Sequence, residues 1–292
     1  MDLKEMWPNF FIVGAGKAGT TSLYEYLKNI DGIYMSPEKE PNYFSVSIDP
    51  SILLSKPIRD KKKYLSLFRN VTDEIAIGEA SPTYLWDPKT PKLIYDLIPD
   101  AKFIMILRNP IERAYSHYLF LLSLGSESSD FSTAIKKSLR FRNDYRGRII
   151  ELGRYGEQLS RYLDIFRKEQ IKILIFEEFF KNPRIYLKDV IQFLGVHYDI
   201  DKINIGNQHN PFSIPKNKMA KNMMQSTTIR KIGKNLIPRK MLPEIKKLLD
   251  RQVSKPPMLE NDRLTLEDIY YDDIRNLEKI IGRTLSWNIT SK

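Results

Sequence analysis

The segment at residues 14–22 carries the residue types and spacing best suited to chemistry. It reads Gly-Ala-Gly-Lys-Ala-Gly-Thr-Thr-Ser and directly follows the apolar run at residues 10–13. Glycines allow a tight turn and let backbone N–H groups come close to an anion. Lys17 adds a full positive charge, and the hydroxyl residues at 20–22 add further donors. A loop of this kind is suited to hold a phosphate group.

Three interpretations of this loop compete. A Walker A loop has four residues between two glycines and a lysine directly after the second one. With Gly14 and Gly19 as these glycines, Thr20 stands where the lysine is needed. The glycines match the Rossmann fingerprint, but that unit also needs a second strand ending in an acidic residue, and residues 36–41 contain two prolines that disfavour a central strand. A cradle for a 5′-phosphosulfate is the third interpretation, and it suits a loop in which Lys17 precedes several hydroxyls.

A second group of polar residues follows the apolar run at residues 102–107. Arg108 comes directly after this run, Pro110 suits the first position of a helix, and Ser116 lies eight residues beyond the arginine. Ligands of open α/β sheets bind at the carboxyl ends of the strands, where Arg108 is expected. A guanidinium fork and a serine hydroxyl together can bind a phosphate dianion. Taken alone, the pattern is better explained by an arginine that pairs with a structural carboxylate.

Alternating apolar runs and helical patterns must position these residues. Strands are predicted at residues 10–13, 75–77, 102–107 and 171–176. Helices are predicted at residues 20–29, 90–98, 111–124, 155–168, 184–194 and 266–281. This alternation predicts an α/β protein with a P-loop-like three-layer fold, in which helices flank a mostly parallel central sheet. Residues 197–240 contain three prolines and little periodicity, so a long irregular loop is predicted there.

The composition limits the kinds of site that the chain can build. There is no cysteine and there are three scattered histidines among 292 residues, so disulfides are excluded and no metal site is predicted. The net charge of +11 fits either a soluble basic surface or an anionic ligand. No dense basic block with interleaved aromatics occurs, which argues against nucleic acid as a partner. Since neither a signal peptide nor an apolar run of about 20 residues is present, no transmembrane segment and a cytoplasmic location are predicted.

At this point the sequence resembles a known family. Residues 11–21 are similar to the 5′-phosphosulfate loop of sulfotransferases that use 3′-phosphoadenosine 5′-phosphosulfate (PAPS), and residues 106–116 are similar to their 3′-phosphate motif. The bacterial relatives of the heparan sulfate N- and O-sulfotransferases resemble the chain most. Weaker matches follow in the family's order at residues 39–44, 78–84, 153–159, 177–179, 193–195 and 277–287. The resemblance therefore covers about residues 10–287.

The resemblance implies a single sulfotransferase domain over residues 1–292 that moves a sulfuryl group from PAPS to a hydroxyl or amine, on a carbohydrate acceptor. It implies two catalytic residues: Lys17, which stabilises the leaving oxygen, and Glu40, which accepts the proton of the acceptor. It implies that the donor nucleotide contacts Gly16, Lys17, Ala18, Gly19, Thr20, Thr21, Arg108 and Ser116. It implies acceptor contacts from Glu79, Tyr84 and Trp86, with Glu79 also a second candidate base. The chemistry requires no metal.

One residue departs from the family pattern, and three other classes of protein remain as alternative interpretations of the sequence. Ala80 stands where the heparan-type enzymes often carry a lysine, so an animal glycosaminoglycan acceptor is unsupported. A kinase-like P-loop protein would bind ATP with Mg²⁺, and a nicotinamide-dependent oxidoreductase would bind NAD. A module that binds anionic polymers through the basic surface would instead show affinity that falls steeply with salt.

Overall fold

A parallel five-stranded sheet forms the centre of the molecule. The computed structural model describes residues 5–50, 53, 55–141, 147–203, 205, 213–215, 250–252 and 256–289. The sheet order is β2-β3-β1-β4-β5, and neighbouring strands pair in parallel. The strands are β1 (Phe10–Gly14), β2 (Ile33–Met35), β3 (Ala76–Ala80), β4 (Lys102–Leu107) and β5 (Ile171–Ile175). Most of the predicted irregular region at about 197–240 lies outside the described residues.

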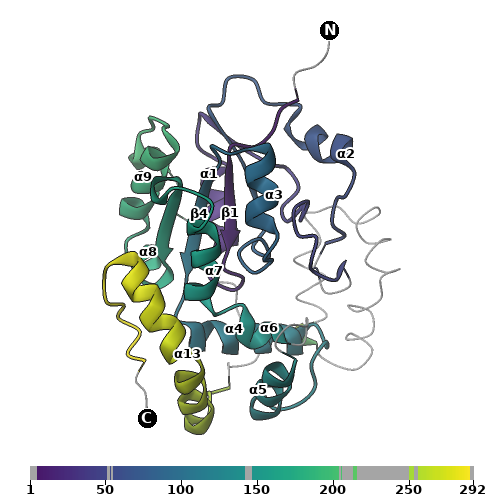
Figure 1. Cartoon of the computed structure of the whole chain (residues 1–292), viewed down its shortest axis with the longest axis vertical. Coiled ribbons are helices and arrows are strands. Elements are labelled where there is room, and N and C mark those ends of the chain that lie inside the picture. The colour runs from purple at the N-terminus through teal and green to yellow at the C-terminus, as the bar shows by residue number, and fades with distance from the viewer. Residues whose placement is uncertain are drawn as a thin grey trace.

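Helices cover both faces of this sheet (Figure 1). Successive side chains of a strand point to opposite faces, and β1 follows this rule. Phe11 and Val13 belong to one hydrophobic cluster, whereas Phe10 and Ile12 belong to the other. The first cluster lies under α3 (Thr90–Leu97), α4 (Pro110–Ser123), α7 (Tyr155–Leu163) and α13 (Glu260–Ile281), and the second under α1 (Thr20–Leu27) and α9 (Pro183–Leu194). The predicted three-layer α/β fold is therefore confirmed.

Shorter elements complete the described fold. The remaining helices are α2 (Lys61–Leu65), α5 (Phe131–Arg140), α6 (Arg148–Glu151) and α8 (Phe176–Lys181), with 3-10 turns at Ser66–Phe68, Lys168–Gln170 and Ile200–Lys202. A short antiparallel pair joins β6 (Ser213–Pro215) and β7 (Asp250–Gln252). Within the described ranges, no helix is long and apolar enough to cross a membrane, and no group of three or more metal-ligating side chains is placed to hold an ion.

The predicted strands and helices mostly coincide with the observed ones. The start of α13 at Glu260 lies six residues before its predicted start at 266, and the observed elements β2, α2, α5, α6 and α8 were not predicted. β2 has three residues, too few to show an alternating pattern. The first turn of α13 carries Glu260 and Asp262, so its polar beginning hides the apolar periodicity. Gly282, with a φ of 75°, ends α13 as predicted.

Candidate functional site

The turn after β1 places an uncapped helix start at the carboxyl edge of the sheet. Ala15 N–H donates to the carbonyl of Ile106 at 2.8 Å, which ties the turn to β4. Gly19 occupies the N-cap position of α1 with a φ of 90°, and no side chain caps the first turn or places an acidic group in it. The first N–H groups of a helix carry partial positive charge and lack intrahelical partners. This helix start is therefore suited to an anion.

The glycines of the turn have different functions. A Cβ on Gly14 would lie 2.7 Å from the Leu85 side chain, and one on Gly19 would lie 2.6 Å from Phe180. Both positions are therefore required by packing. A Cβ on Gly16 would meet nothing within 4 Å, and its φ lies outside the left-handed region. Gly16 thus faces open space, where a ligand can approach the backbone.

Substituting these two glycines should separate stability from binding. Gly16→Ala is expected to keep the free energy of unfolding within about 1 kcal/mol of the wild-type value. It should nevertheless weaken the binding of adenosine 3′,5′-bisphosphate, because the added methyl group occupies the approach to the turn. Gly19→Ala should cost about 1–3 kcal/mol of stability, since its φ is left-handed and Phe180 blocks the methyl. Urea unfolding and calorimetric titration measure both effects; unchanged bisphosphate affinity in Gly16→Ala would contradict ligand approach at this point.

Lys17 links the turn to α4. Its Nζ lies 4.1 Å from the centroid of the Phe120 ring, which is a cation–π contact. Its backbone carbonyl accepts a hydrogen bond from Arg108 Nη1 at 3.4 Å. The charged residue of the turn and the arginine that follows β4 therefore lie side by side.

Arg108 is half-buried at the carboxyl end of β4. Its guanidinium carbon lies 4.7 Å from the centroid of the Phe176 ring on α8. Burial lowers the pKa of Arg108, although the charges of Glu112 and Glu177 act in the opposite direction. A cation in such a poorly hydrated position attracts an anion more strongly than one in bulk water does.

Ser116 lies on the same side of α4 as the ring that holds Lys17. Glu112, Ser116 and Phe120 are spaced four residues apart, and each is partly exposed between buried neighbours. Because Phe120 contacts Lys17, Ser116 lies one helical turn from that contact. The structure thus brings Lys17, Arg108 and Ser116 to one side of the molecule.

Glu40 lies at the same edge of the sheet, beside the end of β3. Its N–H donates to the Ala80 carbonyl at 2.9 Å, and its φ is 61°. Its carboxylate pairs with Lys39 Nζ at 2.7 Å, with both side chains 20% exposed. The residue after Ala80 donates its N–H to Ile12 of β1 at 3.1 Å. Glu40 therefore borders the edge from which the glycine turn emerges.

The three predicted acceptor-side residues differ in exposure. Glu79 and Tyr84 are 0% exposed, and the Tyr84 hydroxyl donates to Glu79 Oε1 at 2.6 Å. Trp86 is partly exposed, and its carbonyl accepts a hydrogen bond from Arg161 at 3.0 Å. Contacts between an acceptor and these residues stay a prediction, and Trp86 is the one of the three with exposed surface.

Burial gives Glu79 an effect on stability that depends on pH. Burial raises the pKa of Glu79 from 4.5 to about 7. Hydrogen bonds from Tyr84, Ser81 and Tyr64 lower this pKa, and the charge of Glu40 raises it, but burial has the largest effect. At a pH between 4.5 and about 7, Glu79 keeps its proton in the folded protein and has lost it in the unfolded chain. The stabilisation is therefore complete below the unfolded pKa and is lost as pH rises through 7.

This linkage predicts a difference between the wild-type protein and Glu79→Gln. As pH rises from about 4 to about 8, the wild-type protein should lose about 3 kcal/mol of unfolding free energy relative to the variant. Urea unfolding of both proteins across that range measures the difference, and other titrating groups cancel in the subtraction. A difference that stays constant, or that grows in favour of the wild-type protein at high pH, would contradict the assigned shift.

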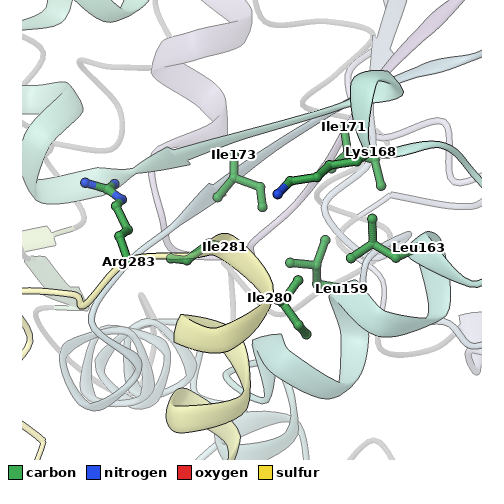
Figure 2. A pocket seen from close by; sticks show the side chains of 8 residues that line it. All are labelled: Leu159, Leu163, Lys168, Ile171, Ile173, Ile280, Ile281 and Arg283. Atoms are coloured by element: carbon green, nitrogen blue, oxygen red, sulfur yellow. The ribbon is translucent and has the colours of Figure 1, made fainter.

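A cavity of about 210 Å³ lies elsewhere on the molecule (Figure 2). It is bounded by β5, α7 and the end of α13, and its lining consists of Leu159, Leu163, Lys168, Ile171, Ile173, Ile280, Ile281 and Arg283. Arg283 pairs with both carboxylate oxygens of Glu178, at 2.8 and 2.9 Å. None of the predicted site residues lines this cavity, so the edge that carries Lys17 and Arg108 remains the better candidate.

Sequence reasoning missed the aromatic residues that hold the two cations. Phe120 lies under Lys17, and Phe176 lies under Arg108. Phe120 follows Ser116 by one helical turn, and this spacing is the only sequence signal that places it near the site. Phe176 follows β5, so its contact with Arg108 depends on the pairing of β4 with β5.

Comparisons with known proteins agree on one family. A family model described as a sulfotransferase domain matches residues 8–255. Mouse carbohydrate sulfotransferase 15 is 29% identical over 245 residues, which cover 65% of this chain and 44% of that protein. A bifunctional heparan sulfate N-deacetylase/N-sulfotransferase 1 from Caenorhabditis briggsae is 27% identical over 205 residues, which cover 66% of this chain and 23% of that protein. The chain thus spans less than half the length of these relatives.

Solved structures show the same similarity. A sulfotransferase from Alicyclobacillus acidocaldarius is 32% identical, with a TM-score of 0.74 over 97% of this chain and 99% of that one. Mouse sulfotransferase SULT7A1 in complex with PAP is 16% identical, with a TM-score of 0.53 over 96% of this chain and 90% of that one. The second similarity concerns the fold alone.

Proposed function

Because the chain belongs to the sulfotransferase domain family, we propose that it moves the sulfuryl group of PAPS to a hydroxyl or amine of a carbohydrate. The observation that carries this proposal is the contact between the two predicted donor-binding groups. Arg108 Nη1 donates to the Lys17 carbonyl at 3.4 Å, so one nucleotide can reach both groups. We propose that the whole chain, residues 1–292, forms one domain of this kind.

The nucleotide is held at two ends. The N–H groups of residues 16–21 and the start of α1 bind the 5′-phosphosulfate, with Gly16 open to its approach. Arg108 and Ser116 bind the 3′-phosphate through charge-assisted hydrogen bonds. The family membership supports this choice of nucleotide, and so does the complex with PAP that one structural neighbour forms.

Two charged residues carry out the transfer. Glu40 accepts the proton of the acceptor hydroxyl or amine as the acceptor atom bonds to sulfur. The bond between sulfur and the 5′-phosphate oxygen breaks, and Lys17 stabilises the negative charge that develops on that oxygen. Adenosine 3′,5′-bisphosphate is left as the second product. Positioning and charge stabilisation dominate such a transfer, as they do in phosphoryl transfer.

A carbohydrate acceptor is supported by the named activities of the relatives. Carbohydrate sulfotransferase 15 and the heparan sulfate N-sulfotransferase are both carbohydrate enzymes by name. On this chain, the partly exposed indole of Trp86 is available to stack on a sugar ring. The predicted cytoplasmic location stays a prediction.

Calorimetry with adenosine 3′,5′-bisphosphate tests the donor assignment. The wild-type protein should bind it in the micromolar range, and Arg108→Ala should weaken binding about 10- to 100-fold, because hydrogen bonds to a dianion are lost. Arg69→Ala removes an exposed arginine that directly follows the 3-10 turn Ser66–Phe68 and serves as the control. Tighter binding of ATP with Mg²⁺, or of NAD, would favour the kinase or oxidoreductase alternative and contradict the proposal.

A ³⁵S-labelled donor, offered with glucosamine and with a desulfated heparan-type oligosaccharide, then reports transfer of the sulfuryl group.

A further inference from the structure

The carboxylate of Glu79 is the centre of a buried set of hydroxyl groups. Oε1 accepts hydrogen bonds from Tyr64 at 2.9 Å and from Tyr84 at 2.6 Å, and Oε2 accepts one from Ser81 at 2.7 Å. The side chain is 0% exposed. In the described part of the chain no cation pairs with it. Both oxygens are therefore occupied, and neither is exposed to solvent.

These hydroxyls connect Glu79 to the segment that carries Glu40. Ser81 Oγ accepts the N–H of Asn42 at 3.1 Å, and the Tyr84 hydroxyl accepts the N–H of Phe44 at 3.3 Å. A hydroxyl has one hydrogen and two acceptor lone pairs. When Glu79 is ionised, each hydroxyl hydrogen goes to the carboxylate, so the lone pairs are left to face the two backbone N–H groups. The carboxylate thus sets the direction in which both hydroxyls act.

The third hydroxyl reaches the same segment through an aromatic ring. Tyr64 stacks on Tyr43, with ring centroids 4.2 Å apart and planes 14° from parallel. Tyr43 lies between the two residues whose N–H groups are held, so residues 42, 43 and 44 each contact a partner of Glu79. This pattern joins one buried carboxylate to three consecutive residues.

The segment itself adopts a conformation that needs such support. Glu40 and Asn42 have φ values of 61° and 52°, in the left-handed region that residues other than glycine rarely adopt. Backbone of this kind persists where its surroundings determine it. Asn42 adds a further tie, since its Nδ2 donates to the Glu40 carbonyl at 2.8 Å.

We propose that Glu79 is a positioning residue that holds residues 42–44, and through them the carboxylate of Glu40, in the place from which Glu40 accepts the acceptor's proton. The reactive role of Glu40 rests on the function proposed above, whereas the hold on the segment rests on the contacts alone. Glu79 therefore acts through Glu40 and touches neither substrate.

The variant Glu79→Gln tests this role at nearly constant shape. The glutamine side chain carries an amide nitrogen in place of one carboxylate oxygen, and this nitrogen cannot accept a hydrogen bond. If it replaces Oε2, Ser81 loses its acceptor, and if it replaces Oε1, Tyr64 and Tyr84 lose theirs. Hydrogen–deuterium exchange should become about 10-fold faster in a peptide covering residues 40–45 and stay unchanged in one covering 14–22. Asp262→Asn is the matched control, because Asp262 is a buried carboxylate that accepts from Ser132 far from the segment. Unchanged exchange in Glu79→Gln would overturn the proposal.

A double-mutant comparison tests whether the hold acts through Glu40. Glu79→Gln alone should lower kcat about 10- to 100-fold and leave the affinity for adenosine 3′,5′-bisphosphate unchanged. In a Glu40→Gln background it should lower kcat by no more than about 2-fold further, because the residue it positions is already inactive. Effects that multiply would indicate a purely structural role and contradict the proposal.

Two further outcomes are distinguishable. If Glu79→Gln does not fold, Ser81→Ala and Tyr84→Phe remove single members of the set, and each must accelerate exchange at residues 40–45 for the proposal to stand. If the wild-type protein transfers no sulfuryl group to any acceptor offered, the proposed function is wrong. In that case the exchange comparison still decides whether Glu79 holds the segment.

Discussion

Glu40→Gln is expected to slow sulfuryl transfer by about 10²–10⁴-fold, the usual loss when a general base is removed. The affinity for adenosine 3′,5′-bisphosphate should stay near the wild-type value. The groups proposed to bind it follow β1 (the Lys17 turn) and β4 (Arg108), whereas Glu40 lies in the segment between β2 and β3. The fold should persist, since the Glu40 side chain is partly exposed and, in the part of the chain that the structure describes, pairs with its neighbour Lys39. Steady-state kinetics with labelled donor, together with calorimetry, measure the two effects separately.

A neighbouring carboxylate provides the control for this substitution. Glu38 lies two residues away in the same segment and is exposed, so Glu38→Gln changes the local charge equally without removing the predicted base. Its kcat should stay within about 2-fold of the wild-type value, as surface substitutions usually do. Equal losses in the two variants, or full activity in Glu40→Gln, would show that another group accepts the proton.

The second large effect is expected from Lys17→Ala. Removing one preorganised donor from a developing oxyanion typically costs about 10²–10³ in rate. The loss should appear mainly in kcat, because the charge that Lys17 stabilises is greatest in the transition state. In this structure the ammonium rests 4.1 Å from the Phe120 ring, on the side of α4 that carries Ser116, so it lies near the expected nucleotide.

Single-turnover measurements with labelled donor test this prediction most cleanly, since they report the transfer step without product release. Lys28→Ala, in which an exposed lysine at the other end of α1 is removed, controls for the change in net charge. If Lys17→Ala weakens bisphosphate binding about 100-fold and leaves the transfer step unchanged, Lys17 binds the donor in its ground state and is not the catalytic cation.

The sequence predicted those parts of the site that follow strands. Lys17 and Arg108 come directly after two apolar runs, and parallel strands have their carboxyl ends at one edge of the sheet. Their proximity therefore followed once the sheet was recognised, and the contact between Arg108 and the Lys17 carbonyl agrees with it. Ser116 was singled out because it lies eight residues beyond Arg108, within the segment that resembles the 3′-phosphate motif.

The surroundings of Glu79 were beyond the reach of sequence patterns. The sequence placed Glu79 after an apolar run, where it looked like a base or an acceptor ligand. Its burial depends on Tyr64, fifteen residues earlier, and on the return of residues 42–44 across the end of β3. No local periodicity encodes contacts between segments so far apart in the chain. The same reason explains why Phe176 was not associated with Arg108.

A crystal structure of the protein with adenosine 3′,5′-bisphosphate tests the central claim most directly. We expect the 5′-phosphate against the backbone N–H groups of residues 16–21, and the 3′-phosphate within hydrogen-bond distance of Arg108 and of Ser116 Oγ. A nucleotide bound with neither phosphate at these groups, for example in the apolar cavity between β5 and α13, would contradict the claim.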